Sequence, residues 1–486
     1  MYTQSKKEAD PPSNYSEPHR PLFHFSPAAH WMNDPNGLIY IDGVYHLFYQ
    51  YNPHASVWGN IHWGHATSID LVHWTHHPPA LHPDPRGLGV VASGSVVVDN
   101  ENTSGLQQSE APAVLVALFS HFPADGRQVQ SAAFSRDKGR TWTMCSANPI
   151  LVEPELKDFR DPKVFWHETT DRWVMVIAAK DHARIYTSTN LLHWTYRNNF
   201  APEGQVAEGI WECPDLFSLA LDGATKWILL ISVQQSGPNG GSAMQYFVGD
   251  FDGERFTADD RPYPLWLDFG TDCYAGVSWS NMEDQARTII AWMSNWRYAD
   301  RVPTSVWRGA MTVPRRLSLA NGPHGPRLRC LPVDELAVLR QTPVFVYNGE
   351  GYLPQQSAEI QLHVHHQDPT TRGKIDVTLK STAGDQLRIS IEVDTGMLLV
   401  DRRDAVGDAT FLQQQMRAPI PEDLLKAATL EGVILMDQSS VEIFLGDGLV
   451  SVTAVVFPNA PLRRFVVAGQ DMSISVVAYP LRSIWN

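Results

Sequence analysis

Residues 31–49 read WMNDPNGLIYIDGVYHLFY, and this stretch decides the fold. Two apolar runs, 37–40 and 44–49, flank the dipeptide Asp42-Gly43, and an Asp-Gly pair between two such runs is typical of a β-hairpin. The arrangement of a strand, a polar turn and a second apolar strand recurs along the chain. Its further copies pair 94–98 with 113–119, 163–166 with 173–179, 215–219 with 227–233, and 276–280 with 288–292.

A second element follows several of these hairpins. It reads Ser-x-Asp-x-x-x-Trp at 68–74, Ser-x-Asp leading to a tryptophan at 135–142, and Ser-x-Asn-x-x-x-Trp at 188–194, so copies lie roughly sixty residues apart. Repeats near that length with about four strands each are typical of propeller blades, and long amphipathic helices are scarce. We therefore predict an all-β chain whose residues 21–340 form a five-bladed β-propeller. An array of ordinary β-sandwiches is the alternative.

The character of the sequence changes after residue 340. Residues 341–356 hold two prolines and two glycines and are predicted to be a linker. About seven alternating strands in residues 357–486 predict a C-terminal β-sandwich. That part shows no obvious cluster of acids or histidines, so we expect it to be structural rather than catalytic. Residues 1–20 form a polar N-terminal segment.

Composition excludes several classes of partner. The formal net charge is -15, from 38 Lys and Arg against 53 Asp and Glu, which argues against nucleic acid. No apolar run reaches the ~18 residues of a membrane span. No secretory signal is visible in residues 1–20, so we expect a cytoplasmic protein, or a secreted one if a signal was removed. The four cysteines are scattered and are expected to be free thiols.

Three carboxylates occupy equivalent places in the repeat. Asp34 lies in WMNDPNG, Asp161 in FRDPKVF and Glu212 in WECPDLF, each just before the first strand of its repeat. In a propeller the first strand of every blade lines the central axis. We therefore expect the three acids to face one another in one funnel-shaped pocket.

Carboxylates that converge in this way cannot all be ionised cheaply, because like charges and burial raise the pKa of at least one of them. The result is a protonated acid beside an ionised carboxylate, which is the arrangement that glycoside hydrolysis needs. For any single site, Asp-Pro before a strand is explained by turn chemistry alone. Recurrence in three blades, each with Trp or Arg close by, favours catalysis.

These residues together resemble glycoside hydrolase family 32. The resemblance rests on WMNDPNG, on the triplet Arg160-Asp161-Pro162 and on the pair Glu212-Cys213. It is strengthened by FYQYNP at 48–53, WGHATS at 63–68, GPNGGS at 237–242, QYFVGDFDG at 245–253 and WRGAMTVPR at 307–315. It is strong over residues 21–317 and weaker in the sandwich, through SSVEIF at 439–444. The exo-inulinase, levanase and yeast-type invertase branch looks most similar.

The resemblance implies a retaining β-fructofuranosidase that releases terminal fructose from sucrose or fructans. Asp34 would be the nucleophile and Glu212 the acid/base. Asp161 would bind fructose hydroxyls and stabilise the transition state, and Arg160 would hold the sugar and set the protonation of its neighbours. The remaining residues implied to line the pocket are Asn33, Gln50, Trp58, Ser95, Tyr274 and Trp292, with Trp296 as an alternative to Trp292.

One departure from the family pattern is Cys273, where the related branch usually has an aromatic residue before the tyrosine. This departure puts the pocket's shape in doubt, not its chemistry. A histidine-rich stretch, 54–82, shows no tight ligand triad, so we expect packing and hydrogen bonding there and no metal. Hydrolysis by carboxylates also needs no cofactor.

Two other functions remain open at this stage. A fructosyltransferase would use the same acids, with a sugar in place of water. A non-catalytic sugar-binding propeller would be indicated by loss of an acid, and all three are present. Family behaviour implies a homodimer formed through the sandwich, and the expected substrate is sucrose, a fructo-oligosaccharide or a fructan.

Overall fold

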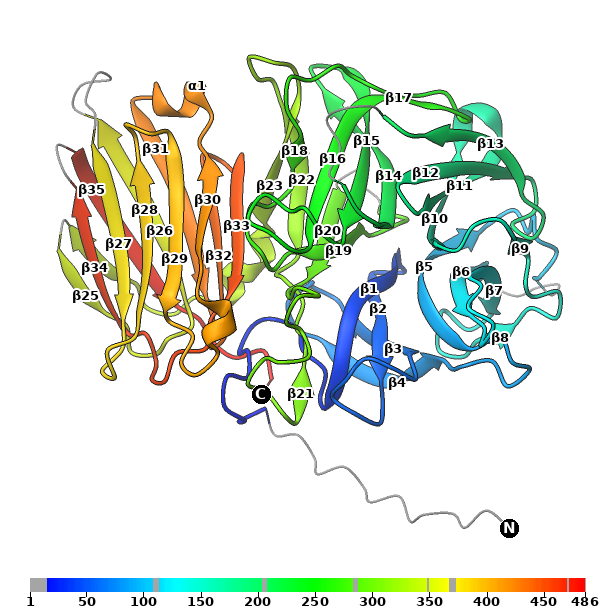
Figure 1. Ribbon diagram of the computed structural model, residues 1–486, viewed down its shortest axis with the longest axis horizontal. Coiled ribbons are helices and arrows are strands. Elements are labelled where there is room, and N and C mark those ends of the chain that lie inside the picture. Colours follow the sequence, from blue (N-terminus) through cyan, green and yellow to red (C-terminus); the bar gives the residue numbers. More distant parts are fainter. Residues whose placement is uncertain are drawn as a thin grey trace, which may run out of the picture.

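The computed structural model describes residues 15–107, 113–202, 208–282, 287–347, 349–366, 373–469 and 472–485. Figure 1 shows two bodies side by side, a ring of sheets and a two-layered sandwich. The predicted all-β fold, a five-bladed propeller followed by a β-sandwich, is confirmed. Among the described residues, no helix has the length and apolar character that a membrane span requires.

Five antiparallel sheets form the blades, each starting with its innermost strand. Blade I holds β1 (His30–Ile41), β2 (Val44–Asn52), β3 (His62–Ser68) and β4 (Thr75–Leu81). Blade II holds β5 (Val90–Asp99), β6 (Val114–Phe122), β7 (Val129–Ser135), β8 (Thr143–Met144) and β9 (Leu151–Val152). Blade III holds β10 (Phe159–His167), β11 (Arg172–Ala179), β12 (His182–Ser188) and β13 (Thr195–Phe200).

The last two blades follow the same order. Blade IV holds β14 (Trp211–Leu221), β15 (Ala224–Val233), β16 (Ala243–Phe251), β17 (Phe256–Ala258) and β18 (Leu265–Trp266). Blade V holds β19 (Tyr274–Ser278), β20 (Arg287–Trp292), β22 (Arg315–Ala320) and β23 (Arg327–Pro332). The short strand β21 (Trp307–Arg308) leaves blade V and pairs in parallel with the start of β1, which ties the last blade to the first.

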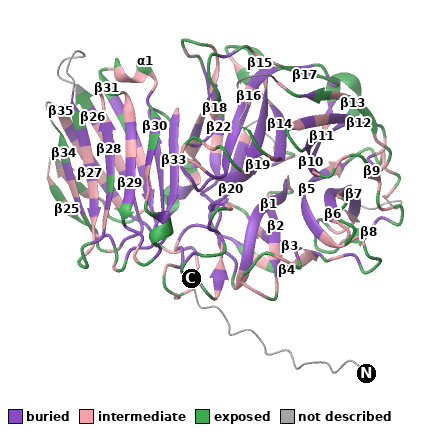
Figure 2. Ribbon diagram, in the orientation of Figure 1, coloured by how far each residue is buried: buried purple, intermediate pink, exposed green. Residues whose placement is uncertain are grey.

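The five first strands contact one another around the propeller axis. They are buried along most of their length, as the purple inner strands in Figure 2 show, because neighbouring blades cover both of their faces. The propeller packs in several apolar clusters between adjacent sheets. The functional side chains of the inner strands are thereby held on rigid elements.

The C-terminal body consists of two six-stranded sheets packed face to face around one apolar core. One sheet has β24 (Val344–Tyr347), β26 (Ala358–His366), β31 (Thr429–Met436), β32 (Ser440–Leu445), β33 (Val450–Val455) and β35 (Met472–Pro480). The other has β25 (Glu350–Tyr352), β27 (Lys374–Lys380), β28 (Gln386–Glu392), β29 (Met397–Asp404), β30 (Gln415–Pro419) and β34 (Arg464–Gly469). The only α-helix of the described chain, α1 (Glu422–Leu425), and the 3-10 turns Glu168–Thr170, Asp334–Leu339 and Thr410–Leu412 complete the regular structure.

Two details of this region differ from the sequence analysis. The described sandwich has twelve strands, where about seven were expected. The stretch 341–356, expected to be a linker, carries the edge strands β24 and β25, which pair with β35 and β34. Both strands are short, and the glycines and prolines around them hid the strand-forming residues Val344–Tyr347 in the sequence. The other domain boundaries stay a prediction.

A buried ionic network joins the two bodies. Arg315 of blade V donates to Asp268 (2.9 Å) and, through Nε, to Glu442 of β32 (3.0 Å). Arg402 of β29 donates to Asp272 of the propeller at 2.8 Å. These side chains are almost fully buried, so removing one partner would leave an uncompensated charge, which typically costs ~3–5 kcal/mol. The network fixes one relative placement of propeller and sandwich.

Candidate active site

A β-bulge recurs near the start of all five inner strands. In each, two residues face one residue of the second strand: Asn33-Asp34, Ala92-Ser93, Asp161-Pro162, Cys213-Pro214 and Ala275-Gly276. Bulges bend a strand and re-aim its side chains, and proline is tolerated there because its missing N–H would be unpaired. Asp161, Cys213 and Ala275 also have positive φ angles of 65°, 44° and 53°, a strained conformation typical of functional sites.

The bulges correct the expected position of the three acids. Asp34, Asp161 and Glu212 do not precede the first strands but lie inside β1, β10 and β14. Asp34 is the second residue of the bulge in β1, and Asp161 is the first residue of the bulge in β10. Glu212 immediately precedes the bulge in β14. The repeat is therefore equivalent only to within two residues. The structure nevertheless brings all three together, because Arg160 contacts Asp161 and Glu212 while Cys213 contacts Asp34 and Asp161.

Asp34 is held by donors on one side only. Its Oδ2 atom accepts from Ser93 Oγ at 2.8 Å and from Gln50 Nε2 at 3.3 Å. Gln50 also donates to the Ser93 hydroxyl, so the pair is oriented as a unit. The other oxygen, Oδ1, is buried and has no hydrogen-bond partner among the described residues. One carboxylate oxygen is thus fixed and the other keeps its lone pairs free.

Cys213 connects two of the acids. Its thiol lies 3.7 Å from Asp34 Oδ2 and 3.6 Å from Asp161 Oδ2, and its backbone N–H donates to Asp161 Oδ2 at 3.1 Å. Burial and the neighbouring carboxylates raise the pKa of this thiol well above its usual value, so it stays protonated. It can therefore donate to either carboxylate.

Glu212 sits between a guanidinium and a phenol. Arg160 donates to Glu212 Oε1 from Nε (3.1 Å) and Nη2 (3.0 Å), and the Tyr274 hydroxyl donates to Oε2. Arg160 is itself oriented by Asp158 at 2.8 Å and Gln128 at 3.1 Å. Glu212 keeps more contact with solvent than the other two acids, with 14% of its side chain exposed. It is the acid placed to exchange protons with a bound molecule or water.

Electrostatics keep a proton within this cluster. Burial, followed by the charge of Glu212, raises the pKa of Asp34 to about 6. Burial also raises the pKa of Asp161 to about 7; the nearby Arg160 lowers it, and the charges of Glu212 and Asp34 raise it. Burial opposes the charge of Arg160, but Glu212 and Asp161 raise its pKa, so it stays cationic. Asp34 and Asp161, close to each other and to one cation, titrate as a coupled pair rather than singly.

An aromatic wall stands beside the acids, made of Trp31, Trp292 and Trp296. The Trp31 ring lies 6.0 Å from each of the other two, and Trp292 and Trp296 are 4.9 Å apart. Trp31 donates to Asn33 Oδ1 at 2.7 Å, which links the wall to the bulge that carries Asp34. The indole N–H groups of Trp292 and Trp296 are buried and have no partner among the described residues. Buried donors are normally satisfied, so a ligand oxygen is a natural partner for them.

The two tryptophans that were proposed as alternatives differ in exposure. Trp292 is completely buried and pairs with Tyr274 in the sheet, whereas Trp296 is half-buried and keeps an accessible surface. Both therefore belong to the wall, and Trp296 presents more of its ring to a ligand.

One expected pocket residue, Ser95, lies elsewhere. Ser95 donates to Pro162 O and accepts from Val164 N, both at 2.9 Å, so it ties β5 to β10 and does not contact an acid. Ser93 takes its expected place, because the bulge at Ala92-Ser93 shifts the alternation of side chains by one position. Trp58 lies in the loop after β2 with 48% of its surface exposed, and its place in the pocket stays a prediction.

Cys273 does not shape this pocket. Its side chain is buried in the apolar cluster of blades IV and V, 3.8 Å from Arg315 at the interface with the sandwich. Adjacent residues of a strand point to opposite faces, so Tyr274 reaches Glu212 while Cys273 faces the core. The departure from the family pattern thus changes the core beside the domain interface.

The loop 237–242 connects the aromatic wall to the sandwich. Asn239 donates to Phe269 O at 2.6 Å and to Arg417 O of β30 at 2.9 Å, and accepts from Arg417 N at 2.9 Å. Three residues later, Ser242 Oγ accepts from the backbone N–H of Trp296 at 3.3 Å. The sandwich thereby helps to hold one wall of the site in place.

The histidines of the histidine-rich stretch stack on aromatic rings and on one another. Groups of three or more His, Cys, Asp or Glu that could hold an ion are absent from the part of the chain that the structure describes. His46 and His65 are buried, stack on Phe48 and share a hydrogen bond of 3.1 Å. The sequence analysis missed Ser93 and the partners of Arg160, Asp158 and Gln128; the Ser-x-Ser pattern at 93–95 was a signal for the first.

Comparisons show that the chain is similar to known proteins in both sequence and structure. Residues 24–332 match the glycosyl hydrolases family 32 N-terminal domain, and residues 339–480 match the C-terminal domain of the same family. A levanase of Bacillus subtilis is 42% identical over 98% of this chain and 72% of its own length. An extracellular exo-inulinase of Aspergillus niger is 35% identical over 97% of this chain and 96% of its own. The crystal structure of an exo-inulinase from Aspergillus awamori superimposes with a TM-score of 0.89 at 32% identity, covering 97% of this chain and 100% of that one.

Proposed function

Because the chain belongs to glycosyl hydrolase family 32, we propose that it is a retaining β-fructofuranosidase that releases terminal fructose from sucrose and fructans. The relatives named levanase and exo-inulinase support the substrate class. The observation that carries the proposal is the convergence of three carboxylates from blades I, III and IV at one end of the propeller axis.

Asp34 is the nucleophile of this proposal. Its free oxygen, Oδ1, forms a bond to the anomeric carbon of the fructosyl unit while the bond from that carbon to the leaving oxygen breaks. Ser93 and Gln50 hold Oδ2, which fixes the direction of attack. Since its pKa is raised to about 6, Asp34 is ionised at neutral pH and still basic enough to attack.

Glu212 is the acid/base. It gives a proton to the leaving oxygen in the first step and takes one from the attacking water in the second, when the bond from Asp34 to the sugar breaks. Arg160 and Tyr274 orient its two oxygens, and its partial exposure gives it access to water. Asp161, next to Arg160 and Cys213, binds fructose hydroxyls and stabilises the positive charge that develops on the ring.

The rest of the sugar is bound by the wall and its neighbours. Asn33 and Gln50 supply amide groups beside Asp34, and the unpaired N–H groups of Trp292 and Trp296 are donors for sugar oxygens. A site that offers free acceptors and free donors together suits a neutral polyol.

The test is release of fructose and glucose, measured side by side on sucrose, inulin and levan. We expect fructose from sucrose with an equal amount of glucose, and fructose one unit at a time from the polymers. Glu212→Gln, which keeps the size of the side chain, is the control and should lose several orders of magnitude in turnover. Glucose in excess of fructose would indicate transfer to sugar instead of water, and no release from any substrate would overturn the proposal.

The compartment and the oligomeric state stay predictions. A cytoplasmic location is expected if the chain has no signal, whereas the relative from Aspergillus niger is named extracellular, which favours the secreted alternative. A homodimer through the sandwich is tested by sedimentation of the purified chain.

A further inference from the structure

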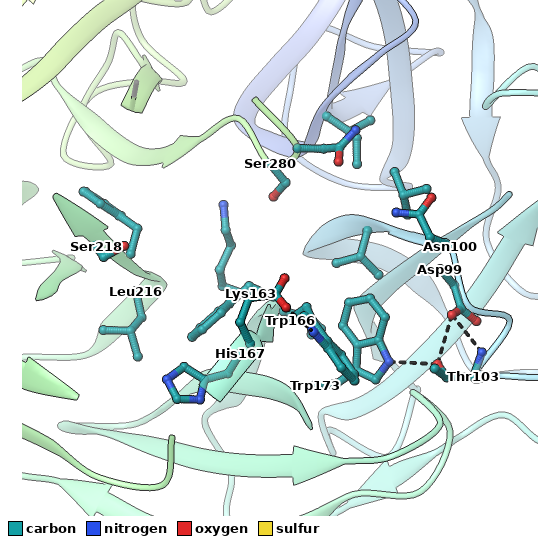
Figure 3. A pocket seen from close by; sticks show the side chains of 18 of the residues that line it. Asp99, Asn100, Thr103, Lys163, Trp166, His167, Trp173, Leu216, Ser218 and Ser280 are labelled. Atoms are coloured by element: carbon teal, nitrogen blue, oxygen red, sulfur yellow. Dashed lines mark hydrogen bonds between the residues drawn. The ribbon is translucent and has the colours of Figure 1, made fainter. Parts of the chain in front are cut away.

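A second pocket opens at the other end of the propeller axis. Its volume is about 710 Å³, within the ~300–1,000 Å³ typical of small-molecule sites. The residues that line it come from the far ends of the inner strands, such as Ile39 of β1, Val98 of β5, Trp166 of β10 and Ser218 of β14 (Figure 3). The acids lie at the near ends of the same strands. All five blades therefore contribute to this distal pocket as well as to the candidate active site.

An ion pair closes the axis between the two ends. Lys163 Nζ donates to Ser278 O at 2.7 Å and to Asp215 Oδ2 at 3.3 Å, and all three residues are buried. On the acid side of Lys163 lies a void of about 10 Å³, beside Asp161 and Cys213. That volume is about the minimum for one water molecule, so no sugar passes. The distal pocket is a separate compartment.

Its charges exclude ions as the natural ligand. Lys163, Arg287 and the buried Asp99 line it, and the lining residues Glu101, Glu168 and Asp171 are exposed. A cation would meet the two basic residues, and an anion would have to pass three acids. A neutral ligand meets neither obstacle.

The uncharged lining suits a polyhydroxylated ligand. Trp166 and Trp227 are half-buried and keep part of their rings accessible, and flat apolar faces of this kind accommodate the C–H faces of sugars. Ser218, Ser280 and Asn281 add hydroxyl and amide groups around them. The Arg287 side chain stacks on Phe217, and its buried Nε has no hydrogen-bond partner among the described residues. A donor without a partner, beside aromatic rings, matches a ring or hydroxyl oxygen.

We propose that this distal pocket is a second binding site for a neutral mono- or oligosaccharide, independent of the catalytic acids. It goes beyond the proposed hydrolysis, because it binds sugar without cleaving it. Trp166 is the principal platform: it packs on Trp173 at 5.1 Å, and its N–H donates to Glu168 at 3.2 Å, which fixes the ring at the mouth of the pocket.

The test uses fluorine NMR of the full chain labelled with 5-fluorotryptophan, in an Asp34→Ala background that does not consume substrate. Kestotriose, maltotriose and inorganic phosphate are the probes. Trp166→Leu assigns the distal resonance and Trp296→Phe assigns the active-site resonance, so the two sites are read separately. Tyr196→Leu is the matched control, because Tyr196 is exposed on the outer strand of the same blade and does not line the pocket.

We expect the Trp166 resonance to shift and saturate with at least one of the two sugars. Trp166→Leu should weaken that binding by at least about tenfold, measured on the Trp227 resonance, while Trp296 responds as before. With Asp34 intact, Trp166→Leu should keep kcat/KM for sucrose, which shows that the fold survives. No shift of Trp166 with either sugar, or a shift with phosphate alone, would overturn the proposal. A silent Trp296 beside a responding Trp166 would count against the proposed hydrolysis only.

Discussion

Replacing Asp34 with asparagine tests whether the raised pKa of this buried carboxyl group lowers the stability of the folded chain. Burial, with the charge of Glu212, raises the pKa of Asp34 from 3.8 to about 6 in the folded chain. Between these pH values the folded chain holds a proton that the unfolded chain has released, so the folded state loses stability as the pH rises. A rise from 3.8 to about 6 corresponds to a loss of about 3 kcal/mol, at ~1.4 kcal/mol for each pH unit.

The amide removes this penalty with little change of packing. Its oxygen can still accept from Ser93 and Gln50, and its NH2 group replaces Oδ1, which already lacks a partner. One unpaired neutral atom thus replaces one unpaired charged atom. We expect Asp34→Asn to abolish turnover and to stabilise the chain by about 1–3 kcal/mol at pH 7.

The assay is thermal unfolding of both proteins from pH 4 to pH 8. The difference in Tm should be near zero at pH 4, grow with pH, and level off above about 6 at a few °C. Asp300→Asn, at an exposed carboxylate in the loop after β20, is the control and should show no such trend. Equal Tm values at every pH would refute the reasoning. A Tm difference, variant minus parent, that is lower at pH 7 than at pH 4 would refute it as well.

Three further predictions follow from the same geometry. The pH profile of kcat/KM should rise through about 6 as Asp34 loses its proton and becomes able to attack; a profile flat from pH 5 to 7 would contradict it. Ser93→Ala should lower kcat by about 10–100-fold, because Asp34 loses an orienting donor, whereas Ser95→Ala should mainly lower Tm. Steady-state kinetics and melting curves measure both effects; a larger loss of kcat in Ser95→Ala than in Ser93→Ala would show that the bulge is misplaced. Asn239→Ala should raise KM severalfold with a smaller change in kcat, because it loosens the loop behind the aromatic wall, and an unaltered KM would show that the sandwich does not influence the site.

Much of the architecture could be predicted because it repeats. The hairpin pattern of residues 31–49 recurs five times, and each copy became the first two strands of one blade. Asp34, Asp161 and Glu212 could be recognised because each stands at the same point of its repeat, to within two residues. Recurrence supplies the long-range information that a single Asp-Pro pair lacks.

What could not be predicted depends on single-residue shifts and on partner strands. The bulge at Ala92-Ser93 exchanges the roles of Ser93 and Ser95, and a one-residue shift turns every following side chain to the other face. The edge strand β24 was hidden by the proline and glycines around its few residues, and its partner β35 lies far away in the sequence. The placement of Cys273 in the core depends in the same way on the direction of a neighbouring tyrosine.

The most direct test of the central claim is to trap the covalent intermediate. Glu212→Ala, incubated with a fructoside whose leaving group needs no proton and quenched in acid, should accumulate a fructosyl-enzyme. Digestion and mass spectrometry should then find one fructosyl unit on the peptide that contains Asp34. A label on the peptide of Asp161, or turnover that inverts the anomeric centre without any label, would contradict the account.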